Sequence, residues 1–253
     1  MPKIAIVDKI HSDGIKLLED NPKFQYEIIE DLSKKNLISK LPSFDGITLR
    51  RGKIDAEILE KCKNLKVISR HGVGYDNVDT KFLKESNITL LITATTASVS
   101  PAEHIMFMIL NISKGIDLYD NAVRSGKFAS IMHMKNNNNF ELANKIILIV
   151  GFGRIGRQLI KRCLGFEMKV NVYDPFVDQK TIESFGGIKV NDLNNGLKEA
   201  DILSLSVPLT EKTYNMINLE KIQMMKKSAV IINTSRGSVV NEKDLNEALN
   251  KGI

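Results

Sequence analysis

The sequence predicts an α/β protein made of two domains with parallel sheets. Short apolar runs alternate with amphipathic segments along most of the 253 residues, which is typical of βα units around a parallel sheet. A polar stretch at 134–139, with four consecutive asparagines, predicts a loop ahead of the second sheet. The hydrophobic fraction of 43% and the charged fraction of 26% are those of a globular chain with one large core or two modest ones.

The first domain is expected over residues 1–99. Asp55 and Asp79 stand at the starts of two of its helical segments, where an Asp side chain can cap a helix. Its strands are expected at 4–7, 24–29, 47–49, 67–69 and 88–92, and its helices at 14–19, 32–41, 55–62 and 78–85.

The second domain is expected over residues 100–253. Ser100-Pro101 opens a helix that is apolar on most sides through Leu110, so we expect this helix to be buried between domains or subunits. After the polar loop a cleaner βαβ pattern follows. Its strands are expected at 146–150, 169–173, 188–190, 202–207 and 229–232, and its helices at 154–164 and 241–251.

Charge and hydropathy argue against several classes of protein. The net charge is +6, but the basic residues are spread along the chain and aromatic residues make up only 6%, so a surface that attracts a small anion is favoured over nucleic-acid binding. No apolar run approaches the ~18 residues that cross a bilayer, and Asp8 follows too early for a signal peptide. We therefore expect a cytoplasmic protein without a membrane or nucleic-acid partner. Cys62 and Cys163 belong to no C-x-x-C pair and are expected to be buried thiols.

Gly151-Phe152-Gly153-Arg154-Ile155-Gly156 is a G-x-G-x-x-G motif between a predicted strand and a predicted helix. The first glycine permits a tight turn, the second lets a pyrophosphate approach the backbone, and the third lets the helix pack on the sheet. The N-terminus of the helix offers free N–H groups and a partial positive charge to phosphates. The motif therefore predicts dinucleotide binding, whereas the lack of a G-x-x-x-x-G-K-[ST] motif argues against a nucleoside triphosphatase.

Asp174 completes this fingerprint, because it stands at the end of the next predicted strand, near the expected offset of ~20 residues. A carboxylate at this position accepts hydrogen bonds from the ribose hydroxyls of the adenosine half. It also repels a 2′-phosphate, so the sequence predicts NAD rather than NADP as the cofactor.

Polar segments follow two further strands of the second domain, at the sheet edge where open α/β sheets bind ligands. They are Val207-Pro208-Leu209-Thr210 and Asn233-Thr234-Ser235-Arg236-Gly237. An arginine such as Arg236 at the end of a buried strand is costly to desolvate unless an anion pairs with it, and its planar fork suits a carboxylate. A surface arginine in a turn is the alternative.

With these motifs the chain resembles the NAD-dependent D-isomer-specific 2-hydroxyacid dehydrogenases. The resemblance runs along the whole chain and rests on five motifs in the family's order. They are 70–79 (RHGVGYDNVD), 102–104 (AEH), 151–156 with Asp174, 207–210 and 233–237. It implies a flavodoxin-like substrate domain and a Rossmann dinucleotide-binding domain that lacks its last strands, and a homodimer in the full-length form. The implied reaction transfers a hydride between NAD and a D-2-hydroxy acid or 2-oxo acid, with D-3-phosphoglycerate or glycerate/hydroxypyruvate as the favoured substrates.

The resemblance also assigns roles to residues of this chain. Arg236 is implied to bind and polarise the 2-oxo acid, and the backbone N–H groups of Val73 and Gly74 to hold the substrate carboxylate. The implied cofactor residues are Gly151, Gly153, Arg154, Ile155, Gly156, Asp174, Val207, Pro208 and Thr234. Arg50 and Arg51 follow a first-domain strand and are candidates to meet a substrate phosphate, although two exposed arginines are the favoured alternative. No metal site is expected.

Two departures from the family pattern leave alternatives open. Members often carry His where this chain has Ser206, which affects a detail of the cofactor groove. The family continues into a strand with a Glu and a loop with the catalytic His, and both are expected to lie beyond Ile253. Among the other histidines, His71 is nearest to the expected substrate loop, while His104 is expected to be a buried structural residue. An NAD-binding but inactive chain therefore stays a rival. A redox-sensing repressor with the same fold is a weaker one, since no basic helix-turn-helix segment is present.

Overall fold

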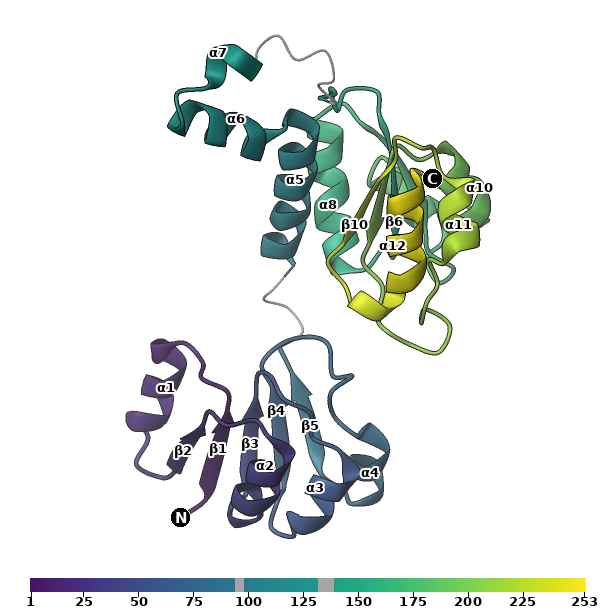
Figure 1. The fold of residues 1–253 in the computed structure, drawn as a ribbon. Helices are drawn as coiled ribbons and strands as arrows, with labels where there is room; N and C mark the ends of the chain where they lie inside the picture. Colours follow the sequence, from purple (N-terminus) through teal and green to yellow (C-terminus); the bar gives the residue numbers. More distant parts are fainter. Residues whose placement is uncertain (94–97, 132–138) are drawn as a thin grey trace. The chain divides into compact units, whose positions relative to one another are not determined.

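The computed structural model describes residues 1–93, 98–131 and 139–253, and the chain divides into two compact units (Figure 1). They are Met1–Ala97 and Ser98–Ile253, and each contains a five-stranded parallel sheet. The α/β class and the two parallel sheets predicted from the sequence are confirmed. The polar loop expected at 134–139 falls almost entirely outside the described residues. Each unit is described by itself below.

The sheet of the first unit has the strand order β2-β1-β3-β4-β5, which is the flavodoxin-like order. Apolar side chains of the central strands, such as Val7 and Ile68, are fully buried with helix residues such as Leu37 and Ile58. The strands are β1 (Lys3–Val7), β2 (Gln25–Ile29), β3 (Gly46–Leu49), β4 (Val67–Arg70) and β5 (Thr89–Ile92), all within a few residues of their predicted positions.

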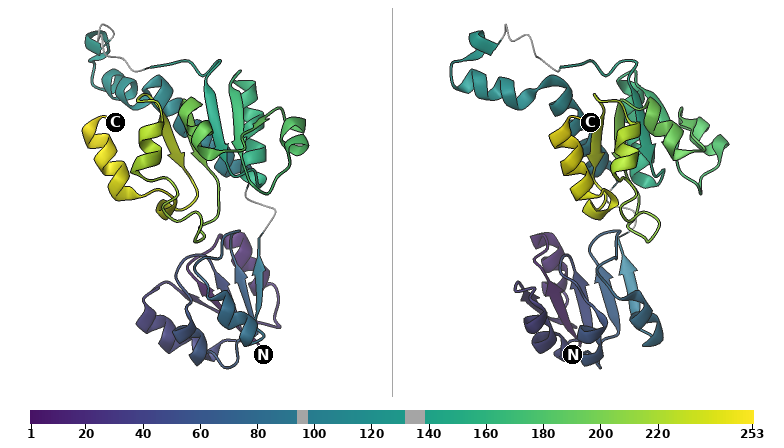
Figure 2. Two further views of the ribbon diagram at one scale, coloured as in Figure 1. Left: turned by 90° about the vertical axis from the view of Figure 1, so that its right-hand side faces the viewer. Right: turned by 45° about the vertical axis from the view of Figure 1, so that its right-hand side comes forward.

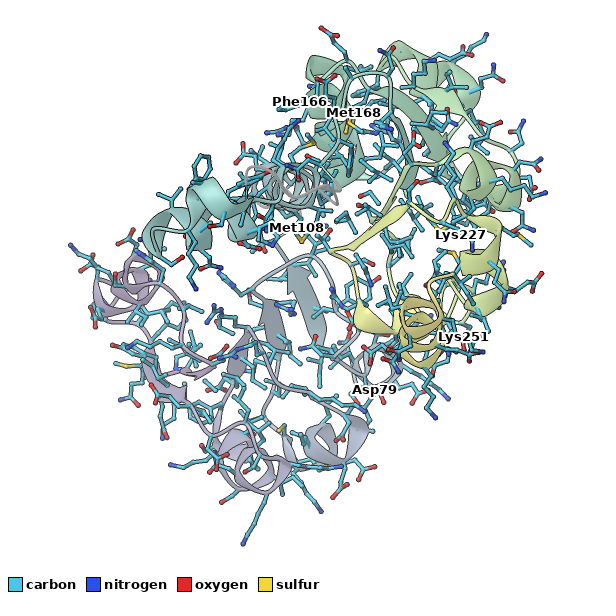
Figure 3. The ribbon with its side chains drawn as sticks, turned by 45° about the horizontal axis from the view of Figure 1, so that its top comes forward. Asp79, Met108, Phe166, Met168, Lys227 and Lys251 are labelled. Carbon is cyan, nitrogen blue, oxygen red and sulfur yellow. The ribbon has the colours of Figure 1, made fainter. Side chains whose placement is uncertain are left out.

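Two helices of the first unit, α3 and α4, begin at the predicted caps Asp55 and Asp79. The Asp55 side chain accepts a hydrogen bond from the Ile58 N–H at 3.2 Å, and Asp79, labelled in Figure 3, accepts one from the Phe82 N–H at 3.0 Å. Each carboxylate satisfies an N–H group that has no partner within its helix. The elements are α1 (Ser12–Glu19), α2 (Lys34–Lys40), the 3₁₀ helix η1 (Leu41–Ser43), α3 (Ala56–Lys61) and α4 (Thr80–Glu85).

The sheet of the second unit has the strand order β10-β9-β6-β7-β8. Counted from β6, this is the order 3-2-1-4-5 of the Rossmann fold. The five strands lie where the sequence predicts them, although β9 ends two residues earlier. They are β6 (Ile146–Val150), β7 (Lys169–Tyr173), β8 (Ile188–Lys189), β9 (Ile202–Leu205) and β10 (Val230–Asn233).

Helices cover both faces of the second sheet (Figure 2). Ile149 and Ile232 face a core shared with α5 (Val99–Lys114) and α8 (Arg154–Gly165), which Met108 and Met168, labelled in Figure 3, also border. The opposite face is covered by α10 (Leu193–Glu199), α11 (Leu219–Met224) and α12 (Glu242–Lys251). The remaining helical elements are α6 (Ile116–Arg124), α7 (Phe128–Ile131), α9 (Gln179–Ser184) and the 3₁₀ helix η2 (Gly237–Val239).

Within the second unit, the helix predicted from Ser100 is buried on one side only, and its burial between domains or subunits stays a prediction. One side of α5 packs against α8, but Phe107 and Ile112 on the same helix are exposed. His104 is also exposed and stacks on Phe107 with 5.9 Å between ring centroids, so it is not the buried histidine that was expected. Within the described residues, no helix combines the length and the apolar composition that crossing a bilayer requires. Cys62 and Cys163 are buried free thiols, as predicted.

Candidate dinucleotide site and substrate loop

The candidate cofactor residues follow the carboxyl ends of strands in the second unit. Since these strands are parallel, their carboxyl ends lie along one edge of the sheet. The strand order reverses between β6 and β9, and open α/β sheets bind ligands in the crevice at such a switch point. The G-x-G-x-x-G turn follows β6, and the segment from Ser206 follows β9, so both border this point.

Gly151 opens the turn with φ of +96°, in the left-handed region that glycine favours. A Cβ atom at this position would lie 2.7 Å from the Ser206 carbonyl oxygen and 2.9 Å from Cγ1 of Val207. The Gly151 N–H donates to the Tyr173 carbonyl oxygen at 2.9 Å. The turn is therefore packed directly on the backbone that follows β9, and a side chain cannot be added there without displacing it.

The other two glycines of the motif have different surroundings. A Cβ on Gly156 would lie 2.5 Å from the Gly151 carbonyl oxygen, so α8 packs tightly on the turn. A Cβ on Gly153 would meet no atom within 4 Å, and no side chain caps the start of α8 at this residue. The N-terminus of α8 therefore faces open space with its partial positive charge, as phosphate binding requires.

Asp174 directly follows β7 and is linked to the glycine turn. Its Oδ2 accepts a hydrogen bond from the Phe152 N–H at 2.8 Å, and its Oδ1 accepts one from the Phe176 N–H at 2.9 Å. A carboxylate offers about four acceptor positions, so the half-buried Asp174 keeps capacity for ribose hydroxyls. The sequence predicted the ribose role, but it carried no signal for the bond to Phe152.

Hydroxyl groups without partners lie at the ends of β9 and β10. The side-chain oxygens of Ser206 and Thr234 are buried and have no hydrogen-bond partner in the described part of the chain. A buried hydroxyl without a partner costs about 1–3 kcal/mol. A dinucleotide along this edge offers such partners through its ribose and amide groups. These hydroxyls, the open space at Gly153 and the start of α8 therefore fit NAD.

The segment from Val207 to Thr210 is held by a residue that sequence reasoning missed. Oγ1 of Thr213 donates to the Pro208 carbonyl oxygen at 2.6 Å and accepts from the Thr210 N–H at 2.8 Å. The backbone that borders Gly151 is thus fixed by a hydroxyl five residues after Pro208. A side-chain-to-backbone bond of this kind is common in turns but gives no recognisable motif.

Arg236 lies just beyond β10 in a turn that Asn233 organises. The Asn233 Oδ1 accepts from the Ser235 N–H at 3.0 Å, and its Nδ2 donates to the Arg236 carbonyl oxygen at 2.9 Å. The half-buried Arg236 donates from Nη1 to the Ser235 carbonyl oxygen at 3.0 Å. The structure therefore places Arg236 at the same sheet edge as the glycine turn, and Asn233 fixes its backbone.

In the first unit, the predicted substrate loop follows β4 and is anchored at both ends. The Arg70 guanidinium donates to the carbonyl oxygens of His71 and Leu49, and its Nε donates to Oδ1 of Asn77 at 3.3 Å. Asn77 in turn donates to the Gly52 carbonyl oxygen at 2.6 Å. Between these anchors, the N–H groups of Val73 and Gly74 make no hydrogen bond to any described residue, which leaves them available to an anion.

Arg50 and Arg51 both lie beside a carboxylate of their own unit. Arg51 binds Asp8 with two hydrogen bonds of 2.6 and 3.1 Å, and Nη1 of Arg50 lies 3.5 Å from the same carboxylate. The hydrogen bond from Arg51 holds the pKa of Asp8 below its usual value. Arg50 remains half-exposed and also donates to the Lys9 carbonyl oxygen at 3.0 Å. Asp8 therefore compensates part of the positive charge that a substrate phosphate would meet.

The chain is similar to proteins of known family. A family model described as "D-isomer specific 2-hydroxyacid dehydrogenase, NAD binding domain" matches residues 106–253. A D-3-phosphoglycerate dehydrogenase of Methanocaldococcus jannaschii is 37% identical over all of this chain and 47% of its own length. A hydroxypyruvate reductase of Thermotoga maritima is 34% identical over 99% of this chain and 79% of its own length.

Solved structures agree with these matches. The D-lactate dehydrogenase of Aquifex aeolicus, complexed with NAD and lactic acid, superposes with a TM-score of 0.86. It is 28% identical, and the match covers 98% of this chain and 74% of that one. Our chain thus spans about half the length of the phosphoglycerate dehydrogenase relative and about three quarters of the lactate dehydrogenase.

Proposed function

The chain belongs to the D-isomer specific 2-hydroxyacid dehydrogenase family, with that family's NAD-binding domain at 106–253, and from this premise we propose that it interconverts a D-2-hydroxy acid and its 2-oxo acid. The observation that carries the proposal is the joint placement of the glycine turn, Asp174 and Arg236 along one sheet edge. When bound, NAD supplies the hydride chemistry, and the protein supplies position and charge.

The roles proposed for the cofactor residues follow from their surroundings. The start of α8, opened by Gly153, faces the pyrophosphate, and Asp174 accepts from the adenosine ribose. Arg154 and Ile155 continue the first turn of α8, while Val207, Pro208 and Thr234 line the groove of the remaining half.

Roles in substrate binding are proposed for residues of each unit taken by itself. Arg236 binds the 2-oxo acid through its guanidinium, whose planar fork matches two oxygen acceptors. In the first unit, the unpaired N–H groups of Val73 and Gly74 receive the carboxylate. Arg50 is proposed to meet a phosphate or hydroxyl on the substrate, in competition with its contact to Asp8.

Within the family we propose a phosphoglycerate-type or a glycerate/hydroxypyruvate-type substrate. The support is the identity to a D-3-phosphoglycerate dehydrogenase and a hydroxypyruvate reductase. The basic composition, with a net charge of +6, also favours an anionic substrate over a neutral one.

The direct test uses a chain extended by the family's segment with the Glu and the catalytic His. Reduction of 3-phosphohydroxypyruvate, hydroxypyruvate, glyoxylate and pyruvate is followed through NADH absorbance and repeated with NADPH. We expect NADH to be preferred because Asp174 repels a 2′-phosphate. Arg236→Lys keeps the charge but loses the fork, so kcat/KM should fall by about 10- to 100-fold. NAD affinity should stay within about twofold.

Arg162→Lys is the matched control, because Arg162 lies on α8 and pairs with Glu103 at 2.9 Å, outside the proposed site. If kcat/KM of Arg236→Lys stays within about twofold of the unaltered chain, Arg236 does not act at the reacting carbon. NAD binding without turnover of any acid would instead favour the rival function, an NAD-binding but inactive or regulatory chain.

We also propose that the protein forms a homodimer through an apolar arm on α5 and α6. The arm consists of large apolar side chains that are all about half exposed or more, on α5, which lies beside α8, and on α6, which extends away from the sheet (Figures 1 and 2). These are Phe107, Ile112, Ile116, Leu118 and Val123. An exposed apolar patch of this kind is typical of an interface between proteins.

Val123→Glu places a charge in the arm and should shift the protein to the monomer, as measured by light scattering after size exclusion. Ile188→Glu is the control, since Ile188 is as exposed as Val123 at 62% but lies on β8. The proposed interface would be contradicted if the unaltered chain has the mass of a monomer, or if Val123→Glu leaves the mass of a dimer unchanged.

A further inference from the structure

The residue between the first two glycines of the turn is held at both of its backbone polar groups. The Phe152 N–H donates to Oδ2 of Asp174 at 2.8 Å, and the Phe152 carbonyl oxygen accepts from Nε of Arg157 at 3.3 Å. The two side chains come from different elements, since Asp174 follows β7 and Arg157 lies on α8. Two successive peptide planes of the turn are therefore fixed from outside the turn.

Arg157 is itself held by two aromatic rings. Its guanidinium carbon lies 5.7 Å from the ring centroid of Phe152 and 5.5 Å from that of Phe185. The two rings meet edge to face with 5.5 Å between centroids, and Phe152 is fully buried in the core between the sheet and α8. A guanidinium over two ring faces is attracted by both, which fixes the direction in which its Nε–H points.

The consequence for ligand binding follows from peptide planarity. The carbonyl of Phe152 and the N–H of Gly153 belong to one peptide, and in a trans peptide these two groups point in opposite directions. The described residues contain no cis peptide bond. Holding the Phe152 carbonyl therefore aims the Gly153 N–H, which has no partner in the described residues, away from Arg157.

We propose that Arg157 is a positioning residue for the pyrophosphate of the dinucleotide, acting through the Phe152–Gly153 peptide. The inference rests on the nucleotide site proposed above and goes beyond it, because it assigns pyrophosphate recognition to an arginine that does not touch the phosphates. It follows that loss of Arg157 weakens ligands that carry a diphosphate and spares those that carry only the nucleoside.

The experiment measures the affinity of this 253-residue chain for ADP and NAD by calorimetry, and for adenosine by displacement of bound NADH fluorescence. In Arg157→Met, the dissociation constants of ADP and NAD should rise about tenfold, while that of adenosine stays within about twofold. Arg157→Lys keeps a cation over the rings without the planar N–H donor, so it should restore part of the affinity. Arg162→Met, on the same helix, should leave all three unchanged.

Each other outcome decides against the inference. Equal losses for ADP and adenosine would assign Arg157 a general structural role, and unchanged ADP affinity would assign it none. If Arg157→Met does not fold, or if adenosine does not compete with NADH, the ADP affinity of Arg157→Lys is the deciding measurement. An ADP affinity of Arg157→Lys equal to that of the unaltered chain overturns the inference. The assay needs no turnover, so an inactive chain that binds ADP still tests it, whereas a chain that binds neither ADP nor NAD contradicts the proposed function as well.

Discussion

Each sheet of the molecule reverses its strand order at one point, between β1 and β3 in the first unit and between β6 and β9 in the second. The residue that follows the central strand differs between the two points. In the second unit it is Gly151, with φ of +96°, and the backbone after β9 packs against it. In the first unit it is Asp8, a non-glycine residue with φ of 68° whose carboxylate binds Arg51.

The comparison separates the role of topology from that of side chains. Parallel order gives both units a switch point where a ligand can bind. In the first unit an ion pair of side chains occupies that point, and Asp8 is only 7% exposed. In the second unit the lack of side chains at Gly151 and Gly153 leaves the start of α8 open. Strand order thus decides where a site can form, and side-chain size decides whether the backbone there is available.

The largest expected effect comes from Gly151→Ala in the second unit. A left-handed φ costs a non-glycine residue roughly 1–2 kcal/mol, and overpacking against Ser206 adds about 1–3 kcal/mol. We therefore expect the free energy of unfolding of this unit, measured by urea titration, to fall by about 2–5 kcal/mol.

Gly153→Ala is the matched variant for that experiment, because its Cβ meets no atom and its φ is −73°. Its stability should change by no more than about 1 kcal/mol, while its NAD affinity should fall about tenfold as the methyl group enters the phosphate space. Equal stabilities of the two variants would contradict the view that Gly151 is needed for packing and Gly153 for ligand binding.

A smaller effect is expected from Arg51→Met at the switch point of the first unit. The substitution removes the main partner of the buried Asp8 but leaves Arg50 nearby. Since Arg51 is largely exposed, the loss of stability at pH 7 should be small and well below the roughly 3–5 kcal/mol of a fully buried pair. NAD affinity, which depends on the other unit, should not change.

The pH dependence of this loss has a definite sign. The pKa of Asp8 is lowered in the folded chain, chiefly by the hydrogen bond from Arg51, so its stabilisation is present above the unfolded pKa of about 3.9. It is lost as the pH falls through the folded pKa. The difference between Arg51→Met and the unaltered chain should therefore shrink between pH 5 and pH 3 in urea titrations. A constant difference would assign the effect to packing.

The smallest effect concerns the thiols, one in each unit, which report on the units separately. Burial raises the pKa of Cys62 to about 11 and that of Cys163 to about 12, so neither should react with iodoacetamide in the native chain at pH 8. Cys62 follows the six-residue α3, whereas Cys163 lies within the twelve-residue α8. With increasing urea we expect Cys62 to be labelled first. Simultaneous labelling, read by mass spectrometry of peptides, would indicate that the two units unfold together.

Much of this architecture was predictable because it is encoded by local patterns. The ten strands are short apolar runs, and the caps Asp55 and Asp79 sit at the starts of helical spacing. Helices α6, α9, α10 and α11 were not predicted. Three of them have only six or seven residues, a length at which a helical period is weak evidence, although the equally short α2, α3 and α4 were predicted. The sequence did not show which side of α5 packs on α8, because the helix is apolar on most sides and hydrophobicity alone does not reveal which residues find a neighbour within the unit.

The residues of the candidate site divide in the same way, into those that a local sequence pattern identifies and those that it does not. The motif residues from Gly151 to Gly156 and Asp174 were found because spacing and element order define them. The hydrogen bond from Phe152 to Asp174 spans 22 residues, and the stacking of Arg157 on Phe185 spans two elements. Asn233 and Thr213 act through single bonds to nearby backbone. Such contacts depend on the folded arrangement, so a single sequence gives no periodic signal for them.

The contact between Gly151 and position 206 does not depend on the side chain at 206. The close contact to Gly151 comes from the main chain of Ser206, and the main chain is common to all residues. The glycine directly after β6 is therefore required by the backbone that follows β9, a strand that ends more than fifty residues later in the sequence. For protein engineering, the side chain at position 206 can therefore be changed to alter the groove. Position 151 has to remain glycine.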